Sequence, residues 1–335
     1  MRSPELVCPA GSLPALKVAV DHGADAVYIG LKDATNARNF AGLNFDAAAA
    51  REGVRYAHSR GRRVLMAINT YPQAGDEKKW RTAVDAAADL GVDAVIMADM
   101  ALLDYAAKTH PRMRRHLSVQ GSATNYEAIN LCRDWFGIER VVLPRVLTID
   151  QVAHVIANTD VEVEVFGFGS LCVMVEGRCL LSSYATGDSP NTAGVCSPAR
   201  AVRWQESPSG TQARLSGILI DEYSPDEPAG YPTLCKGRFA VASETYYALE
   251  EPTSLNVIEL LPELLRIGVS AIKVEGRQRS PAYVTAVTSV LREAIDSAVA
   301  AGDGRFHVKP QWQQALGRVA EGQQVTLGAY NRPWK

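Results

Sequence analysis

The sequence predicts an α/β protein folded as a (β/α)8 TIM-like barrel with a long cysteine-bearing insertion between strands 7 and 8. Three observations support this fold class. Short apolar segments rich in β-branched residues alternate with Ala- and Leu-rich helical segments, and this alternation occurs eight times. It is interrupted once, by roughly 100 residues after the seventh strand. An open doubly wound sheet is the alternative, because strand order cannot be deduced from one sequence.

Each expected strand is short and apolar, which is typical of a parallel sheet covered on both faces. The eight strands are expected at residues 5–10, 26–30, 63–68, 94–99, 116–120, 140–145, 162–169 and 271–276. The helical segments between them have apolar residues at helical spacing, and glycine marks several of their ends, as at Gly23, Gly61, Gly91 and Gly137. Thr148 is a suitable N-cap for the helix after the sixth strand.

We expect the barrel to span residues 1–300, including an iron–sulfur insertion at 170–250, and a C-terminal extension at 301–335 to pack on it. The insertion is rich in Gly, Pro and Ser and contains strand-like pieces such as AVRW and GILID. Insertions of this length after a barrel strand are usually functional. The last 35 residues have no continuous helical pattern.

Composition and charge exclude several classes of protein. The chain has 35 basic and 37 acidic residues and a net charge of -2, which argues against general binding of nucleic acid. It contains no apolar stretch of about 18 residues, so we expect no membrane span. Pro4, Glu5, Pro9 and Gly11 interrupt the segment where a signal peptide would be apolar, so a cytoplasmic location is expected.

Four of the six cysteines fall in the insertion, with the pattern C-x6-C-x16-C-x38-C: Cys172, Cys179, Cys196 and Cys235. In a cytoplasmic chain of this size, such cysteines indicate metal or redox chemistry rather than disulfides. Four thiolates suit zinc or an iron–sulfur cluster. Structural zinc sites usually contain cysteine pairs two to four residues apart, and this pattern has none, so the spacing favours a cluster.

The insertion cysteines have basic neighbours in the sequence, whereas the other two cysteines are isolated from any other cysteine. Basic residues close in sequence to three of the four insertion cysteines could offset the negative charge of a cluster: Arg178, Arg200, Lys236 and Arg238. Cys8 and Cys132 have no cysteine or histidine nearby, and we expect them to be small buried hydrophobic residues.

Polar side chains follow the expected strands at the ends that would meet over the barrel mouth: Asn69, Asp99, Gln120, Arg145, Lys273, Glu275 and Arg277. Barrel enzymes build their sites at this face. For each residue alone, a salt bridge or a helix cap is at least as good an explanation as a ligand contact. The motifs H-E-x-x-H and G-x-S-x-G are both absent, so the sequence contains no familiar hydrolase signature.

Residues 164–183 carry the pattern E-x-F-x-x-G-S-L-C-x-x-x-x-G-x-C-x-L-S, which closely resembles the signature of the collagenase-like peptidase family of unassigned catalytic type. Further motifs along the chain resemble the branch of that family that acts in ubiquinone biosynthesis: CPAGSLPALKVAVDHGADAVYIGLKDATNARNFAGLNF, SPNTAGVCSPAR, GYPTLCKGR, LEEPTSLN and KVEGRQRSPAYV. The resemblance covers essentially the whole chain.

This resemblance implies a barrel and a [4Fe–4S] cluster held by the four insertion cysteines. It implies a heterodimer with a homologous UbiV-like cluster protein, and ring hydroxylation of ubiquinone precursors without O₂, with prephenate linked to the hydroxyl oxygen. A prephenate-like donor has two carboxylates, for which Arg145 and Arg277, with Lys273 as a third cation, are the candidate ligands. The alternative for these cations is pairing with local carboxylates such as Glu275.

Three other functions stay open. The family name suggests a peptidase, although the sequence shows no hydrolytic machinery. Relatives in the same superfamily hydroxylate bases of ribosomal or transfer RNA, but they generally carry additional C-terminal sequence, and the near-neutral charge also counts against RNA. The chain could also be an electron-transfer or scaffold subunit whose partner holds the substrate.

Overall fold

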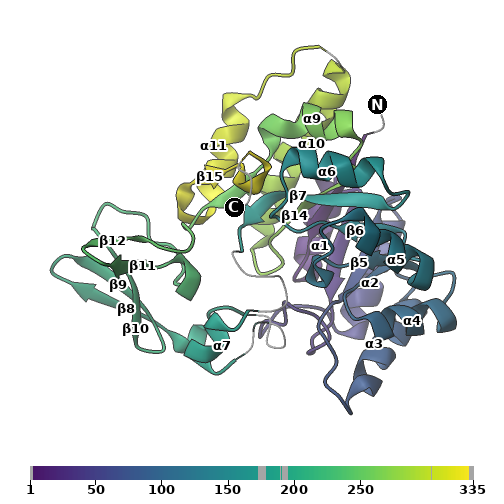
Figure 1. Ribbon diagram of the computed structural model, residues 1–335, viewed down its shortest axis with the longest axis horizontal. Coiled ribbons are helices and arrows are strands. Elements are labelled where there is room, and N and C mark those ends of the chain that lie inside the picture. The colour runs from purple at the N-terminus through teal and green to yellow at the C-terminus, as the bar shows by residue number, and fades with distance from the viewer. Residues whose placement is uncertain (1–2, 173–178, 189, 191–194, 303, 332–335) are drawn as a thin grey trace.

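Eight parallel strands close into a barrel within the part of the chain that the computed structural model describes, residues 3–172, 179–188, 190, 195–302 and 304–331. Seven of them are neighbours in sequence order: β1 (Glu5–Pro9), β2 (Ala26–Gly30), β3 (Arg63–Ile68), β4 (Ala94–Met97), β5 (Arg114–Leu117), β6 (Arg140–Val142) and β7 (Glu162–Ser170). The strand β14 (Ala271–Val274) pairs in parallel with both β7 and β1 and closes the barrel (Figure 1). The predicted barrel is confirmed, and the open sheet is excluded.

Some strands end earlier than predicted, because the residues that follow already belong to turns or caps. β4 stops at Met97, and the Asp99 side chain accepts a hydrogen bond from the backbone N–H of Leu102 at 3.0 Å, which caps the next helix. β5 both starts and ends earlier than expected, since the Ser118 side chain caps a short 3₁₀ turn. Local capping therefore decides where the strands end.

Helices cover the outside of the barrel: α1 (Leu13–Asp21), α2 (Ala47–His58), α3 (Glu77–Leu90), α4 (Met100–Thr109), α5 (Tyr126–Phe136), α6 (Ile149–Ala157), α9 (Leu261–Ile267) and α10 (Pro281–Ala301). The predicted cap at Thr148 is confirmed: its hydroxyl accepts from the N–H of Gln151, whose side chain accepts from the N–H of Thr148. Among the described helices, none combines the length and apolar character that crossing a membrane would need.

The barrel wall has an apolar core on each side. Leu6 and Val64 belong to the larger core, between the strands and the helices. Inside the barrel lies a second apolar layer, formed by Val7, Ala26, Tyr28, Leu65, Ala94, Ile96 and Ala271. Because successive side chains of a strand point to opposite faces, burial on both sides explains why the strand sequences are almost continuously apolar.

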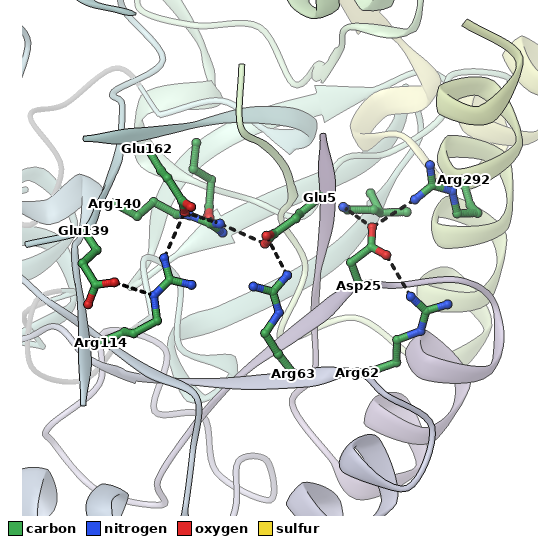
Figure 2. A network of polar contacts seen from close by, with 11 residues as sticks. Glu5, Asp25, Arg62, Arg63, Arg114, Glu139, Arg140, Glu162 and Arg292 are labelled. Atoms are coloured by element: carbon green, nitrogen blue, oxygen red, sulfur yellow. Dashed lines mark hydrogen bonds and ion pairs between the residues drawn. The ribbon is translucent and has the colours of Figure 1, made fainter. Parts of the chain in front are cut away.

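Charged side chains fill the end of the barrel where the strands begin. Arg140, 1% exposed, lies 2.6 Å from Glu162, 2.9 Å from Glu5 and 3.2 Å from Glu164. Glu164 is completely buried and also lies 2.6 Å from the Nζ of Lys273. Figure 2 shows the same network continuing outward to Arg63, Arg114 and Glu139. These charges can be buried because each is paired with an opposite charge.

The insertion between β7 and β14 forms its own small elements, which project to one side of the barrel (Figure 1). They are α7 (Leu181–Thr186), an antiparallel sheet of β8 (Val202–Ser207), β9 (Gly210–Leu215) and β10 (Ile218–Tyr223), and the hairpin of β11 (Arg238–Val241) and β12 (Glu244–Tyr247). The strand-like pieces AVRW and GILID contribute to β8 and β10. A small separate core of Ala201, Val202, Leu215 and Ile220 stabilises the three-stranded sheet, and Ala185 of α7 packs against it.

The C-terminal segment contains a helix, α11 (Pro310–Val319), so the expectation of no continuous helix there was wrong. Trp312 and Leu316 lie one turn apart and are both buried, and the Trp312 Nε1 donates to Glu293 of α10 at 2.8 Å. One buried pair and a proline in the first turn suffice for this helix, whose apolar pattern is too short to detect in the sequence. Beyond it, β15 (Val325–Thr326) pairs with β13 (Ser254–Asn256), which pairs with the end of β7.

Replacing Arg140 should destabilise the fold strongly. In Arg140→Met, Glu164 keeps only Lys273 as a buried partner, and Glu5 and Glu162 lose their shared cation. We expect the free energy of unfolding to fall by about 3–5 kcal/mol, measured by urea denaturation. The exposed Arg112 provides the matched control, because Arg112→Met should change stability little. Equal stability of the two variants would contradict this account of the barrel interior.

Candidate functional site

A polar cavity of about 60 Å³ lies at the ends of the barrel strands, on the face where barrel enzymes place their sites. It is lined by Tyr28, Ala37, Arg38, Asn69, Val119, Gln120, Arg145, Phe166, Lys273, Glu275, Arg277 and Gln278. The structure thus brings the polar groups expected over the barrel mouth together, with one exception. Asp99 does not line the cavity, because its carboxylate caps α4.

Glu275 holds two arginines at the cavity. One carboxylate oxygen lies 2.5 Å from Arg145 Nη2 and the other lies 3.3 Å from Arg38 Nη2. The Arg145 guanidinium also stacks on Phe166, 3.5 Å from the ring centroid. Burial raises the pKa of Glu275, but the charges of Arg145 and Arg38 outweigh burial and hold it below its ordinary value. Glu275 is therefore ionised and holds both guanidinium groups in place.

Lys273 is also paired. Its Nζ lies 2.6 Å from Glu164 and 4.0 Å from the centroid of the Tyr28 ring. Burial lowers the pKa of Lys273, and the charge of Glu164 opposes this without fully restoring it. Lys273 and Arg145 thus both pair with carboxylates of the protein, which was the alternative interpretation of these cations.

Arg277 differs from the other two expected cations. Its side chain is 4% exposed, and its Nε and Nη1 have no hydrogen-bond partner among the described residues. The guanidinium lies 5.8 Å from the Tyr28 ring centroid. Burial lowers the pKa of Arg277 to about 10, so the side chain still carries its charge at neutral pH. A buried cation without a paired carboxylate is unusual and requires an explanation.

The backbone leaves room for Arg277 at two glycines. A Cβ at Gly30, the last residue of β2, would collide with Arg277 Nη1, and a Cβ at Gly11 would collide with the carbonyl oxygen of Arg277. Both glycines precede Arg277 by more than 240 residues in the sequence. The two glycines therefore leave the space that the guanidinium and the backbone of Arg277 occupy.

The four insertion cysteines are free thiols and are all partly buried. Burial, together with the negative charges of Cys172, Cys196 and Cys179, raises the pKa of Cys235 to about 12. Burial also raises the pKa of Cys196, which the charge of Arg38 opposes and that of Glu275 increases. Cys196 therefore lies near the Arg38 and Glu275 side of the cavity.

The chemistry of these donors fits an iron–sulfur cluster, because the insertion supplies four cysteines, whose thiolates are soft ligands. Segments 173–178 and 191–194 of the insertion lie outside the described residues. Among the residues that are described, no three His, Cys, Asp or Glu side chains are arranged to hold a metal ion. The cysteines therefore fit a cluster by donor type, and their described positions do not form a ready metal site.

The basic residues near the cysteines form ion pairs of their own. Lys236, which follows Cys235, lies 2.6 Å from Glu321, and both side chains are largely buried. Arg238 lies 2.5 Å from Asp221, and Arg200 pairs with Asp188. Arg178 lies outside the described residues. Their charges are therefore largely balanced by local carboxylates.

The two remaining cysteines lie in the barrel body. Cys8 is completely buried and accepts a hydrogen bond from the Thr288 hydroxyl at 3.2 Å, and burial raises its pKa to about 12. Cys132 is half-buried against the outer core, and burial raises its pKa as well. The expectation of a buried hydrophobic role is confirmed for Cys8, and Cys132 packs at the edge of the core.

The sequence analysis did not single out three residues of this region: Arg38, Tyr28 and Phe166. Arg38 lies in the long segment between β2 and α2, within the motif TNARNF, and a position after a barrel strand was the available signal. Tyr28 and Phe166 lie inside strands, where an aromatic residue gives no sign that it faces a cavity.

Comparisons with known proteins give several matches. The sequence model of peptidase family U32 matches residues 11–332. An uncharacterized protease of Methanocaldococcus jannaschii is 34% identical over 313 residues, which are 92% of this chain and 68% of that protein. A tRNA hydroxylation protein of Bacillus subtilis is 30% identical, covering 95% of this chain and 69% of that protein. The Escherichia coli synthase of 5-hydroxycytidine in 23S rRNA is 28% identical, covering 88% and 40%.

The contribution of the Glu275 ion pairs to stability should depend on pH. Because its folded-state pKa lies below the ordinary value of 4.5, its contribution to stability is complete above about pH 4.5 and is lost as the pH falls through the lower value. At neutral pH, we expect Glu275→Gln to cost about 3 kcal/mol, since it leaves Arg145 buried without its carboxylate. The difference in Tm between wild type and Glu275→Gln should shrink on acidification. A Tm difference that stays constant down to about pH 3 would contradict the assignment of Glu275 as an ionised partner of the two arginines.

Proposed function

The chain belongs to peptidase family U32, and we propose that it is a hydroxylation protein of that family, which works without O₂ and is not a protease. The observation that carries the proposal is the group of four cysteines beside a cavity lined by cations. The names of relatives support hydroxylation, since they include tRNA and rRNA hydroxylation proteins. The absence of H-E-x-x-H and G-x-S-x-G from the sequence speaks against a familiar hydrolytic mechanism.

In this proposal Cys172, Cys179, Cys196 and Cys235 hold a [4Fe–4S] cluster. When bound, such a cluster supplies one-electron chemistry or an iron that acts as a Lewis acid. Burial of the thiols and the nearby Arg38 give the group a partly dry, charge-compensated environment. Both features influence the potential of iron–sulfur clusters.

The chain's own residues bind and orient the small-molecule oxygen donor. Four cations line the cavity with one carboxylate, Glu275, so the cavity favours an anion. A donor of the prephenate type carries two carboxylates and fits this charge. Glu275 fixes the guanidinium groups of Arg38 and Arg145, and the guanidinium of Arg145 also stacks on the ring of Phe166. Such preorganised donors and cations position a substrate with little loss of entropy on binding.

For the acceptor, we propose a ubiquinone precursor, in the role of UbiU, because motifs along the whole chain resemble that branch of the family. The resemblance also supports a heterodimer with a homologous UbiV-like cluster protein. A base of tRNA or rRNA is the second candidate. The named relatives favour RNA more than they favour ubiquinone, since their hydroxylation substrates are RNA molecules.

The cluster assignment predicts a clear division among the six cysteines. We expect Cys172→Ala, Cys179→Ala, Cys196→Ala and Cys235→Ala each to remove most of the bound iron from anaerobically purified protein. Cys8→Ala and Cys132→Ala are the matched controls and should keep it, because their thiols pack in or against the core. Iron and sulfide content and the electronic spectrum measure the effect. Full retention of iron in any two of the four insertion variants would overturn the assignment.

The acceptor can be identified in cells that lack this chain and grow without O₂. We expect ubiquinone precursors without ring hydroxyl groups to accumulate, while hydroxylated nucleosides in tRNA and rRNA stay at wild-type levels. Mass spectrometry of quinones and of digested RNA measures both in the same culture, and aerobic growth is the control. Loss of a hydroxylated nucleoside with unchanged quinones would replace the first candidate by the second. Purified chain should then be assayed with prephenate, with and without its homologous partner.

A further inference from the structure

Within the described part of the chain, one cation at the barrel-mouth cavity, Arg277, has no carboxylate partner. Both oxygens of Glu275 are engaged by Arg145 and Arg38, and Lys273 has Glu164 at 2.6 Å. The Arg277 side chain is 4% exposed and makes no hydrogen bond or ion pair with a described residue through Nε or Nη1. Arg145, Arg38 and Lys273 thus each have a carboxylate partner among the described residues, although the first two share Glu275.

The position of Arg277 is fixed by its surroundings. Gly30 and Gly11 leave the space that its guanidinium and its backbone occupy, because a side chain at either glycine would collide with Arg277. The Tyr28 ring lies beside the guanidinium, and the Tyr28 hydroxyl donates to the carbonyl of Val274 at 2.9 Å, so the ring is itself held in place. A charged group this buried is expensive to keep unpaired unless a ligand compensates it.

We propose that Arg277 is the residue that binds a carboxylate of a small organic acid at the inner end of this cavity, because Arg145 and Lys273 already pair with carboxylates of the protein. The inference rests on the proposed function only for the identity of that acid, which would be the oxygen donor. A cavity of about 60 Å³ accommodates a carboxylate group or a few waters. The remainder of the acid extends toward the open mouth. A planar guanidinium donates parallel hydrogen bonds to a carboxylate, which gives both affinity and orientation.

Calorimetric titration of the full-length protein, isolated anaerobically, tests this binding directly. The probes are prephenate, phenylpyruvate and the methyl ester of phenylpyruvate, which keeps the ring and keto group without the charge. We expect both acids to bind and the ester to bind at least about tenfold more weakly than phenylpyruvate. Arg277→Met should weaken binding of the acids about a hundredfold. Arg277→Lys should weaken it less, because lysine keeps the positive charge but cannot donate two parallel hydrogen bonds to a carboxylate.

Two glycine variants separate the position of the guanidinium from its charge. Gly30→Ala places a Cβ in collision with Arg277 Nη1 and 2.6 Å from Asn36 Cγ, so it displaces side chains beside the cavity without altering any charge and should weaken binding as well. Gly317→Ala is the matched control, because a Cβ there meets nothing within 4 Å, and binding should be unchanged. Without ligand, Arg277→Met should unfold at the same temperature as wild type or higher, since it removes an unpaired buried charge. A purely structural arginine would instead lower that temperature.

Wild-type affinity in Arg277→Met, equal affinity for acid and ester, or no binding of any acid to wild type would each overturn the proposal. If Arg277→Met does not fold, the comparison of wild type with Arg277→Lys and Gly30→Ala replaces it. Binding through Arg277 in a protein that hydroxylates nothing would leave the site standing and remove the proposed function. Hydroxylation at the wild-type rate in Arg277→Met would remove the site and leave the function standing.

Discussion

The charge of Glu164 inside the barrel is the constraint on which the other features depend. Glu164 is completely buried on β7, and it is stable there only because Arg140 of β6 and Lys273 of β14 lie on either side of it. These three strands are adjacent at the point where the barrel closes. The ion pairs therefore act across the closing seam, and they also orient Lys273 at the floor of the cavity. Hydrophobic packing alone would close the barrel but would not fix these charges.

Above that floor, the balance of charge determines what the cavity can accept. Glu275 neutralises part of the charge of Arg38 and Arg145 and holds both guanidinium groups in place. It also raises the pKa of Cys196, so the cavity and the cysteine group influence each other electrostatically. A change at Glu275 would consequently affect both. This proximity gives a physical reason for treating the cations and the cysteines as parts of one site.

Much of the barrel could be predicted from the sequence, because each strand is a short apolar segment buried on both faces and separated from the next by a helix with a recognisable cap or glycine stop. Strand ends were less predictable, since Asp99 and Ser118 end their strands through side-chain caps. Helix α11 was missed because Trp312 and Leu316 are its only fully buried residues among those described. The gathering of Asn69, Gln120, Arg145, Lys273, Glu275 and Arg277 followed from strand polarity alone. Strand polarity did not indicate which of these cations would be paired. Glu164, which pairs with Lys273, and Arg38, which shares Glu275 with Arg145, come from other parts of the chain.

The contact between Lys236 and Glu321 has a consequence for biosynthesis. Glu321 also accepts a hydrogen bond from Ser170 at the end of β7, at 2.8 Å, so one late carboxylate ties the segment after Cys235 to the barrel. Ribosomes complete a chain from its N-terminus, and Glu321 emerges long after Cys235 has left the exit tunnel. The cysteine-bearing segment therefore gains the buried counter-charge of Lys236 only after the residues between Cys235 and Glu321 have been synthesised. The contacts that attach this segment to the barrel therefore form after the segment itself has been made, because their shared carboxylate lies much later in the sequence.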